Sequence, residues 1–389
     1  MKRFHIATDS EILAGKVTDA YFVRTMEVLE QTDASKPVVM EIRAASLPAK
    51  WDWAVLAGVE ELVFFMEGIR KPVDLFCLDE GTLFRAGDPV GYVIGDYKDI
   101  CIYETAILGL LCQASGIATR AARCVKAAEG RAVLSFGARR LHPAVAPLVD
   151  RNAFIGGCVG FSSVITGELL EKNAAGTMPH SLILLVGDTV EASEMFDAYI
   201  HPKVPRISLI DTFNDEKFEA IQTAEAMGDK LYGVRVDTPA SRRGNMLDLL
   251  KEIRWELDIR GHQKVRIVAT GGIDEYKIME LNPVCYGYGV GTAISNAPVV
   301  DFAMDIVEID GRPIAKRGKL SGRKRLLAQG NSYKEREIVF WKGDDPRQSQ
   351  DLITAKTKQG VRTADSPPAD RIREHVLQQL ANVPLESLR

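Results

Sequence analysis

The sequence predicts an α/β protein in which an irregular (β/α) barrel follows a mixed α+β domain and precedes a small appendage. Three observations predict this organisation. Short strands cut by Gly-Asp turns lie within residues 1–130, apolar strands alternate with helical segments over residues 131–325, and a polar stretch broken at "SPPAD" fills residues 326–389. Repeated strand–helix units imply parallel strands with right-handed crossovers.

The first domain combines helices with antiparallel strands. "TDSEILAGKVTDAYFVRTMEVLEQ" has helical spacing after a capping residue at Thr8 or Asp9, and "KPVVMEIRA" is strand-like. The turns in "VDLFCLDEGTLFRAGDPVGYVIGDY" separate short strands in an antiparallel pattern. A long helix runs from Tyr103 to about Gly130 and is apolar on most faces, so we expect it at a domain junction.

The barrel domain shows strands of five to eight residues separated by helical patterns such as "DEKFEAIQTAEAMG" and "RGNMLDLLKEIRWELDIRG". About seven strands are expected, one short of a closed barrel of eight, so an open sheet is the alternative. The predicted strands are residues 132–136, 153–157, 181–187, 206–211, 231–237, 265–272 and 285–292. In the appendage we expect one amphipathic helix near the end of the chain.

Composition excludes several classes of function. Apolar residues make up 46% of the 389 residues, and the net charge of −4 gives no general affinity for nucleic acid. The six cysteines form no CxxC motif, which argues against zinc and for reduced thiols in a cytoplasmic chain. The N-terminus has no apolar core of a signal peptide, and no apolar run of about 18 residues predicts a membrane span.

Two of the predicted strands end in the same pair of residues, "LIDT" and "RVDT". Asp211 and Asp237 therefore fall at the carboxyl ends of parallel strands, where α/β folds place their ligands. Two carboxylates there can bind Mg²⁺ or sugar hydroxyls and can stabilise a cation that develops between them. The alternative is that each aspartate only caps the helix that follows.

Glycine turns end the last two predicted strands. "TGG" contributes Gly271 and Gly272, and "GVGT" contributes Gly289, Gly291 and Thr292. Barrel enzymes often hold a phosphate on these two loops, where backbone N–H groups approach the anion closely. Tight βα turns also use glycine without any ligand.

Cationic and aromatic residues also lie at the carboxyl ends of the predicted strands, the edge of the sheet that is called the rim below. "SFGARRLHP" places Phe136 for stacking on a planar ring and Arg139 and Arg140 for pyrophosphate or carboxylate, although core and surface roles are the alternatives. His180 precedes a predicted strand, a position where a histidine is structural more often than reactive. The whole set suits a ligand with phosphates, a ribose-like ring and a metal, a description that phosphoribosyl pyrophosphate meets.

Several stretches resemble nicotinate phosphoribosyltransferase, particularly the short archaeal-type enzymes, within the group that includes quinolinate and nicotinamide phosphoribosyltransferases. They run in order over roughly residues 8–325: "VTDAYFVRT", "YETAILGLLCQASGIAT", "SFGARRLHPA", "GTMPHSLILLVGD", "LIDTFNDEKF", "RVDTPASRRGN", "TGGID" and "YGVGTAIS". The resemblance implies an N-terminal sandwich-like domain beside an irregular barrel. It also implies a homodimer in which each subunit completes the other's site, and such dimers could assemble further.

The resemblance implies roles for single residues. Tyr21 and Phe136 would hold the two faces of the pyridine ring, with Tyr21 supplied across the dimer. Asp211 and Asp237 would lie near the ribose and Mg²⁺, and His180 would be phosphorylated by ATP. Arg139 would lie near the base and pyrophosphate, and the glycines and Thr292 would cradle the 5′-phosphate. Further substrate contacts are expected from Arg140, Thr177, Arg235 and Thr238.

The sequence also departs from the family pattern. Val159 stands where relatives carry an aspartate near the base, so Ser162 or Ser163 is the expected replacement. Residues 326–389 contain no cysteine for the zinc knuckle of some short relatives, and no zinc is expected.

The expected function is the ATP-coupled formation of nicotinate mononucleotide for NAD salvage. A quinolinate phosphoribosyltransferase that uses Arg139, Arg140 and Arg235 on a second carboxylate is the first alternative. A non-catalytic homologue that binds nucleotides is the second.

Overall fold

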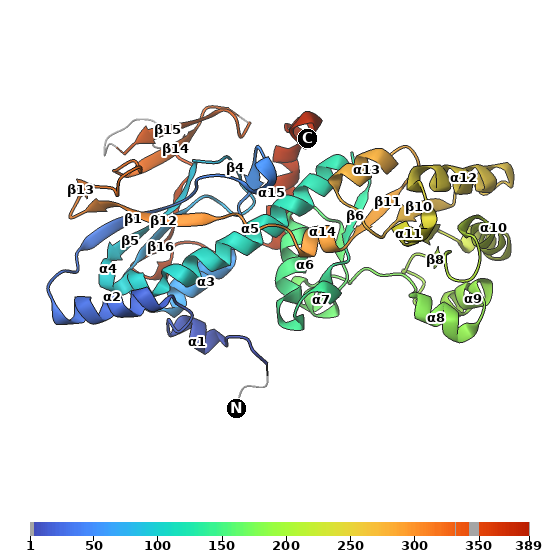
Figure 1. The fold of residues 1–389 in the computed structure, drawn as a ribbon, viewed down its shortest axis with the longest axis horizontal. Coiled ribbons are helices and arrows are strands. Elements are labelled where there is room, and N and C mark those ends of the chain that lie inside the picture. Colours follow the sequence, from blue (N-terminus) through green and yellow to red (C-terminus); the bar gives the residue numbers. More distant parts are fainter. Residues whose placement is uncertain (1–3, 331, 342–349, 389) are drawn as a thin grey trace. The chain divides into compact units, whose positions relative to one another are not determined.

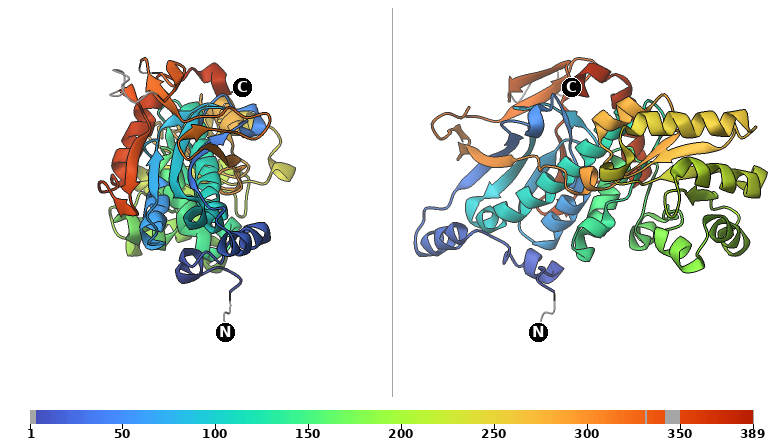
Figure 2. Two further views of the ribbon diagram at one scale, coloured as in Figure 1. Left: turned by 90° about the vertical axis from the view of Figure 1, so that its left-hand side faces the viewer. Right: turned by 45° about the vertical axis from the view of Figure 1, so that its right-hand side comes forward.

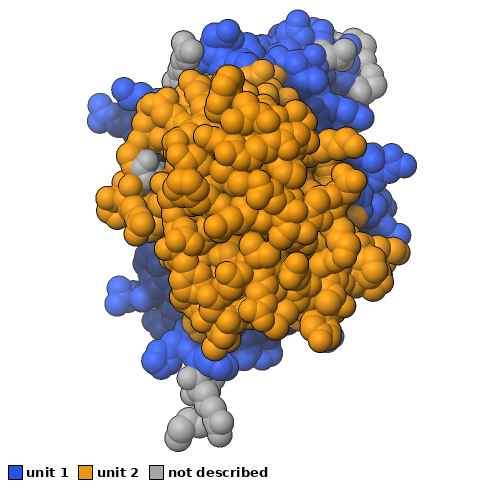
Figure 3. All heavy atoms as spheres, turned by 90° about the vertical axis from the view of Figure 1, so that its right-hand side faces the viewer, with its two compact units in different colours: residues 1–119, 297–387, 389 blue, residues 120–296, 388 orange. Residues whose placement is uncertain are grey.

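The computed structural model describes residues 4–330, 332–341 and 350–388, which form two compact units. Unit 1 takes the chain up to Thr119 and residues 297–387, and unit 2 takes residues 120–296 with Leu388 (Figures 1 and 3). Helix α5, Glu104–Ala127, continues from unit 1 into unit 2. The predicted long helix is therefore confirmed.

Unit 1 is built on a seven-stranded antiparallel sheet in the order β13-β12-β1-β5-β3-β16-β17. Its strands are β1 (Pro37–Ala44), β3 (Asp74–Cys77), β5 (Pro89–Asp96), β12 (Phe302–Ile309), β13 (Arg312–Pro313), β16 (Thr354–Lys358) and β17 (Val361–Arg362). Two smaller sheets pair β2 (Ala54–Val55) with β4 (Leu83–Phe84), and β14 (Lys324–Ala328) with β15 (Arg336–Phe340). One apolar core joins the sheet with helix α3, Val59–Gly68.

The helices of unit 1 begin where the sequence places capping residues. Thr8 caps α1 (Asp9–Leu13) in a capping box with Glu11, and Asp19 precedes α2 (Ala20–Gln31). The remaining helical elements are η1 (Pro48–Lys50), α4 (Tyr97–Ile100), η2 (Cys101–Tyr103), α15 (Ala369–Ala381) and η7 (Leu385–Leu388), whose last residue belongs to unit 2.

The two ends of the chain share one sheet. Strand β12, which the sequence assigned to the barrel domain, pairs with β1 along its whole length. Strand β16, assigned to the appendage, pairs with β3. Residues 297–387 therefore belong to the unit that the first 119 residues build, because these long-range pairings complete its sheet.

One helical stretch, Tyr97–Ala127, is long and apolar enough to cross a membrane by length and composition alone. In the structure 56% of its most apolar window is buried inside the protein. The core helix of a soluble protein passes the same test, so the stretch is weak evidence for a span.

Unit 2 contains a curled sheet of six parallel strands in the order β7-β6-β11-β10-β9-β8. The first strand pairs with the last, as in a barrel, but among the described residues β7 does not pair with β8. The unit is thus an open half-barrel, with helices such as α12 along its outer side (Figures 1 and 2). The strands are β6 (Ala132–Ser135), β7 (Gly160–Phe161), β8 (Ile207–Leu209), β9 (Gly233–Val236), β10 (Arg266–Ala269) and β11 (Gly287–Val290).

Five of the seven predicted barrel strands are confirmed, as β6 and β8–β11. The other two are wrong. Residues 153–157 end helix α6, Ala146–Ile155, and residues 181–187 lie in helix α8, His180–Val186, and its Gly187 cap. The remaining helical elements of unit 2 are η3 (Ala138–Arg140), η4 (Pro143–Val145), α7 (Val164–Leu170), α9 (Thr189–Tyr199), α10 (Glu216–Met227), η5 (Gly228–Lys230), α11 (Ala240–Arg243), α12 (Met246–Ile259), α13 (Glu275–Leu281) and α14 (Thr292–Ser295).

Candidate active site

The two predicted carboxylates lie on neighbouring strands. Asp211 follows β8 and Asp237 follows β9, and these strands pair in parallel register. The Asp211 side chain is only 3% exposed, and its Oδ1 accepts no hydrogen bond among the described residues. Burial raises the pKa of Asp211 to about 6; the Asp237 charge raises it further, whereas the His180 imidazole favours ionisation. Asp211 is therefore a buried carboxyl group whose Oδ1 has no hydrogen-bond partner among the described residues.

His180 joins this pair. Its Nε2 lies 3.7 Å from Asp211 Oδ1, and its Nδ1 lies 3.1 Å from Thr212 Oγ1. His180 begins helix α8, which an apolar cluster that includes Ile183 and Leu209 packs against the end of β8. A histidine that contacts the rim in this way can carry out nucleophilic or acid–base chemistry.

Arg235 lies on β9, two residues before Asp237. It donates a hydrogen bond to Thr177 Oγ1, and its Nη2 lies 4.0 Å from Asp237 Oδ2. Burial lowers the pKa of Arg235, and the charge of Arg139 lowers it further, against the opposing effect of Asp237 and Asp211. Two guanidiniums are therefore close enough to interact beside the carboxylate pair, an arrangement that suits an anionic group.

The structure shows why glycine is needed in the turns that follow β10 and in β11. Gly271 and Gly272 have φ angles of 82° and 70°, and a Cβ on Gly271 would lie 3.0 Å from Asp237 Oδ1. A Cβ on Gly289 would lie 2.4 Å from the ring of Phe136, which packs flush against the strand. Glycine is therefore required at Gly271 and Gly289 because Asp237 and Phe136 pack directly against the backbone there.

Other predicted site residues are exposed on the surface. Arg139 and Arg140 are exposed on η3, just after Phe136, and Thr292 is exposed at the start of α14 beside Gly291. Tyr21 lies in unit 1, where its side chain is 57% exposed on α2, so the geometry of unit 2 does not include it.

The segment that departs from the family pattern is ordered by a buried carboxylate. Val159 is exposed, whereas Ser162 and Ser163 are half-buried. Asp150 accepts hydrogen bonds from Ser135 Oγ and from the backbone N–H of Ser163. The contact tethers residues 160–163 to the end of β6, next to the position of Phe136.

Two buried glutamates of α10 lie beside the site but were not predicted from the sequence. Glu216 accepts a hydrogen bond from Thr238 Oγ1, which also lies 3.3 Å from Asp211 Oδ2. Glu219 accepts backbone N–H groups from the loop after β8. The only signal was the acidic spacing in "DEKFE", which a solvent-exposed helix start also produces.

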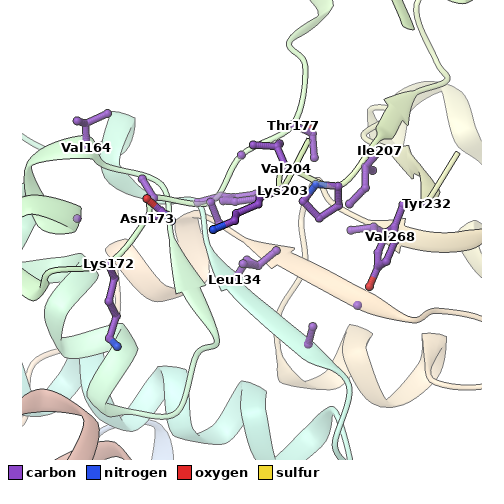
Figure 4. Close-up of a pocket in the computed structure, with 18 of the residues that line it drawn as sticks. Leu134, Val164, Lys172, Asn173, Thr177, Lys203, Val204, Ile207, Tyr232 and Val268 are labelled. Carbon is purple, nitrogen blue, oxygen red and sulfur yellow. The ribbon is translucent and has the colours of Figure 1, made fainter. Parts of the chain in front are cut away.

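A cavity of about 1210 Å³ opens inside the half-barrel (Figure 4). Phe136 and Thr177 belong both to this cavity and to the candidate site. The walls are largely apolar, with Lys172 and Lys203 among the lining residues. The cavity is lined by residues 132, 134, 136, 164, 167–168, 171–177, 201, 203–205, 207, 232, 268 and 286–288.

The donor set can be tested against Mg²⁺. No group of three or more His, Cys, Asp or Glu is arranged to hold a metal among the residues that the structure describes. Mg²⁺ usually takes only one or two protein carboxylates, with phosphate oxygens and water as the other ligands. The unpartnered Oδ1 of Asp211 and the adjacent Asp237 fit that role.

Comparisons with known proteins identify relatives of this chain. Family models for the N-terminal and C-terminal domains of quinolinate phosphoribosyl transferase match residues 19–115 and 117–305. A nicotinate phosphoribosyltransferase from Mycobacterium tuberculosis is 29% identical, over 83% of this chain and 80% of that protein. Nicotinate phosphoribosyltransferase from Bos taurus is 34% identical, over 79% of this chain and 72% of that protein.

Two solved structures share the whole architecture. Nicotinate-nucleotide pyrophosphorylase from Pyrococcus furiosus matches with a TM-score of 0.94 and 48% identity, over 99% of this chain and 100% of that one. Human nicotinic acid phosphoribosyltransferase matches with a TM-score of 0.71 and 19% identity, over 96% and 95%, a likeness of fold. The chain belongs to the nicotinate and quinolinate phosphoribosyltransferase family.

Proposed function

We propose that this protein is an ATP-coupled nicotinate phosphoribosyltransferase, which forms nicotinate mononucleotide and pyrophosphate from nicotinate and phosphoribosyl pyrophosphate in NAD salvage. The observation that carries the proposal is the contact of His180 with both Asp211 and Thr212 at the rim. A transfer of the phosphoribosyl group alone needs no histidine there, whereas coupling to ATP does. The names of the relatives from Mycobacterium tuberculosis and Bos taurus support the choice of nicotinate.

In the transfer step, the pyridine nitrogen of nicotinate attacks the anomeric carbon while the bond from that carbon to pyrophosphate breaks. Positive charge develops on the ribose, and the carboxylates of Asp211 and Asp237 lie where they can stabilise it. Arg235 and Arg139 offer positive charge to the departing pyrophosphate. Mg²⁺, which Asp211 and Asp237 would hold, adds charge neutralisation of the phosphates when it is bound.

The base needs two aromatic faces. Phe136 offers one, because its ring lies against Gly289 at the end of the half-barrel and borders the cavity. We assign the other to the partner subunit's Tyr21 in a homodimer; the exposure of this side chain on α2 leaves it accessible. Nicotinate then stacks between the rings with its nitrogen directed to the ribose.

In the coupling step, a nitrogen of His180 attacks the γ-phosphorus of ATP. A P–N bond forms as the P–O bond to ADP breaks, and water later hydrolyses the phosphohistidine to phosphate. Asp211 and Thr212 orient the imidazole before the attack.

The test is pyrophosphate release from phosphoribosyl pyrophosphate and Mg²⁺, with nicotinate and quinolinate in parallel, each with and without ATP. Release with nicotinate, enhanced by ATP, is the expected result. Incubation with γ-labelled ATP should give acid-labile label that the His180→Ala variant lacks. Binding of phosphoribosyl pyrophosphate with no release would instead indicate a non-catalytic homologue.

A second candidate activity is quinolinate phosphoribosyl transfer with decarboxylation. The matched family models carry that name, and the exposed Arg139 and Arg140 could bind a second carboxylate. Release only with quinolinate, with CO₂ and without any effect of ATP, would establish it and contradict the proposal above.

A further inference from the structure

Arg266 lies at the amino end of the half-barrel, opposite the rim. It is the first residue of β10 and shares a strand face with Val268, which lines the cavity. Gly233, its partner in register on β9, leaves room beside it, because a Cβ there would lie only 3.3 Å from Arg266 Cβ. The Arg266 side chain therefore projects from the inner face of the half-barrel, at the end where the strands begin.

Two tyrosine rings hold the guanidinium group of Arg266. Its Cζ lies 4.1 Å from the ring centroid of Tyr232 and 4.3 Å from that of Tyr286, and the two phenol oxygens are 3.1 Å apart. Both tyrosines line the cavity. Cation–π contacts of this kind restrict the orientation of a guanidinium, but they do not provide an acceptor for its N–H groups. The donors of Arg266 are therefore held in place by contacts that leave them available.

The neighbouring arginines are used differently. Arg206, immediately before β8, donates hydrogen bonds to Asp197 Oδ1 and to four backbone carbonyls. Arg254 on α12 donates to Asp258 and to two carbonyls. The Arg266 side chain makes no hydrogen bond and no ion pair with any residue that the structure describes. Arg206 and Arg254 thus stabilise the loops around them, whereas the donors of Arg266 are open to a ligand.

Lys203 adds positive charge to the same cavity. It belongs to the loop that leads into β8, and its side chain makes no ion pair within the described ranges of the chain. In Figure 4 it lies between Tyr232 on one side and Lys172 on the other. The acidic lining residues, Glu168 and Glu171, are close to Lys172 in sequence, at the end of α7, and so belong to the wall away from Tyr232. The part of the cavity next to Tyr232 is therefore cationic.

We propose that this amino end is a second ligand site, which binds a small aromatic carboxylate with the guanidinium of Arg266 as its anchor. Because the tyrosine rings pack against the guanidinium, a ligand meets its N–H edge, and the paired donors of that edge match the two oxygens of a carboxylate. The tyrosine rings, together with Ala132 and Ile207 of the lining, suit a planar apolar body.

The proposed site is distinct from the rim. Strands rise about 3.3 Å per residue, so Arg266 lies about 13 Å from Thr270, which follows β10 at the rim. The cavity volume of about 1210 Å³ also exceeds the roughly 300–1000 Å³ of a typical site for one small ligand. Both ends of the cavity can therefore be occupied at once, and the proposal holds whichever phosphoribosyl transfer takes place at the rim.

The experiment is ¹⁹F NMR of the full-length protein, labelled with 3-fluorotyrosine and titrated with benzoate. The signals of Tyr232 and Tyr286 are identified by their loss in Tyr232→Phe and Tyr286→Phe. We expect both signals to shift and saturate, and the Kd for benzoate to rise by about tenfold or more in Arg266→Gln, which removes a charge-assisted pair of hydrogen bonds. Benzamide, which has the same ring without the charge, should bind about tenfold more weakly or worse. Lys264→Gln, which removes an exposed charge two residues before Arg266, is the matched control and should leave the Kd unchanged.

Several outcomes would overturn the proposal. They are the absence of shifts at both tyrosines, an unchanged Kd in Arg266→Gln, and equal binding of benzamide and benzoate. Shifts that persist in Arg266→Gln but are lost in Phe136→Leu would place benzoate at the rim instead. Because the Arg266 side chain donates no hydrogen bond within the described part of the chain, Arg266→Gln should fold, which circular dichroism checks. If it does not fold, Arg266→Lys, which keeps the charge but loses the paired donors, is judged by the same change in Kd.

Discussion

Replacing Gly289 with alanine tests whether Phe136 forms one face of the base site. A Cβ at this position would lie 2.4 and 2.6 Å from two ring carbons of Phe136 and 2.6 Å from Thr270 Cγ2. Ordinary contacts begin at 3.4 Å. The Phe136 ring must therefore move by about 1 Å, since the β-branched Thr270, which directly follows the neighbouring strand β10, is the stiffer neighbour.

The displacement has two separable consequences. Overpacking of this kind costs about 1–3 kcal/mol in the free energy of unfolding, which urea denaturation measures. A stacking face shifted by about 1 Å should lower kcat/KM for nicotinate by about a hundredfold. The KM for phosphoribosyl pyrophosphate should change much less, because the ring is assigned to the base and not to the phosphates.

Gly287→Ala is the matched control on the same strand. Its Cβ would meet Ala132 O at 3.1 Å and Ala132 Cβ at 3.3 Å, so a shift of a few tenths of an ångström relieves it. We expect a smaller loss of stability and little change in kinetics. If Gly289→Ala loses stability but keeps kcat/KM for nicotinate, Phe136 does not hold the base and the reasoning is refuted.

Three further predictions concern acidic residues. Asp237→Asn should lower kcat by about a hundredfold to a thousandfold while circular dichroism stays unchanged, and near-wild-type turnover would remove its assigned role. Glu275 is fully buried against Arg120 and Arg123, so Glu275→Gln should cost about 3–5 kcal/mol in urea unfolding, whereas a loss below 1 kcal/mol would contradict it. Burial raises the pKa of Glu104 from 4.5 to about 7, so its stabilising contribution is present below pH 4.5 and is lost as pH rises through 7. The loss of unfolding free energy should amount to about 1–2 kcal/mol, allowing for the partial exposure of Glu104. If the Glu104→Gln variant shows the same loss between pH 4.5 and 7, Glu104 is not its cause.

Local sequence patterns predicted several helices and strands but not their long-range pairing. The capping box at Thr8 and the apolar run of α5 can be read from a few neighbouring residues. The pairing of β12 with β1 joins segments some 260 residues apart, and no local pattern encodes such a partner. The same limit explains why residues 297–325 were assigned to the barrel: each segment was identified by its nearest neighbours in sequence.

Some residues of the candidate site could be predicted from local sequence and others could not. Asp211 and Asp237 could be predicted because both follow apolar strands, and parallel strands end on one rim. Glu219 could not, because its partners are backbone N–H groups whose positions depend on how the loop after β8 folds. Arg235 was expected among the substrate contacts, but its bond to Thr177 depends on a segment that crosses from the neighbourhood of β7.

The prediction of a strand at residues 181–187 conflicts with the predicted role of His180 beside Asp211. A residue that precedes a parallel strand lies at the amino end of the barrel, on the face opposite the rim that Asp211 occupies. The structure resolves the conflict with a helix. Residues 172–177 follow helix α7 and pass beside β7, where the Ala175 N–H donates to Phe161 O, and Thr177 accepts a hydrogen bond from Arg235 on β9. Helix α8 then starts at His180 beside Thr212, with Ile183 buried and Leu185 86% exposed, a pattern that no strand buried on both faces would show. The missing strand pairing between β7 and β8 is therefore what allows a histidine from this segment to reach the carboxylate rim.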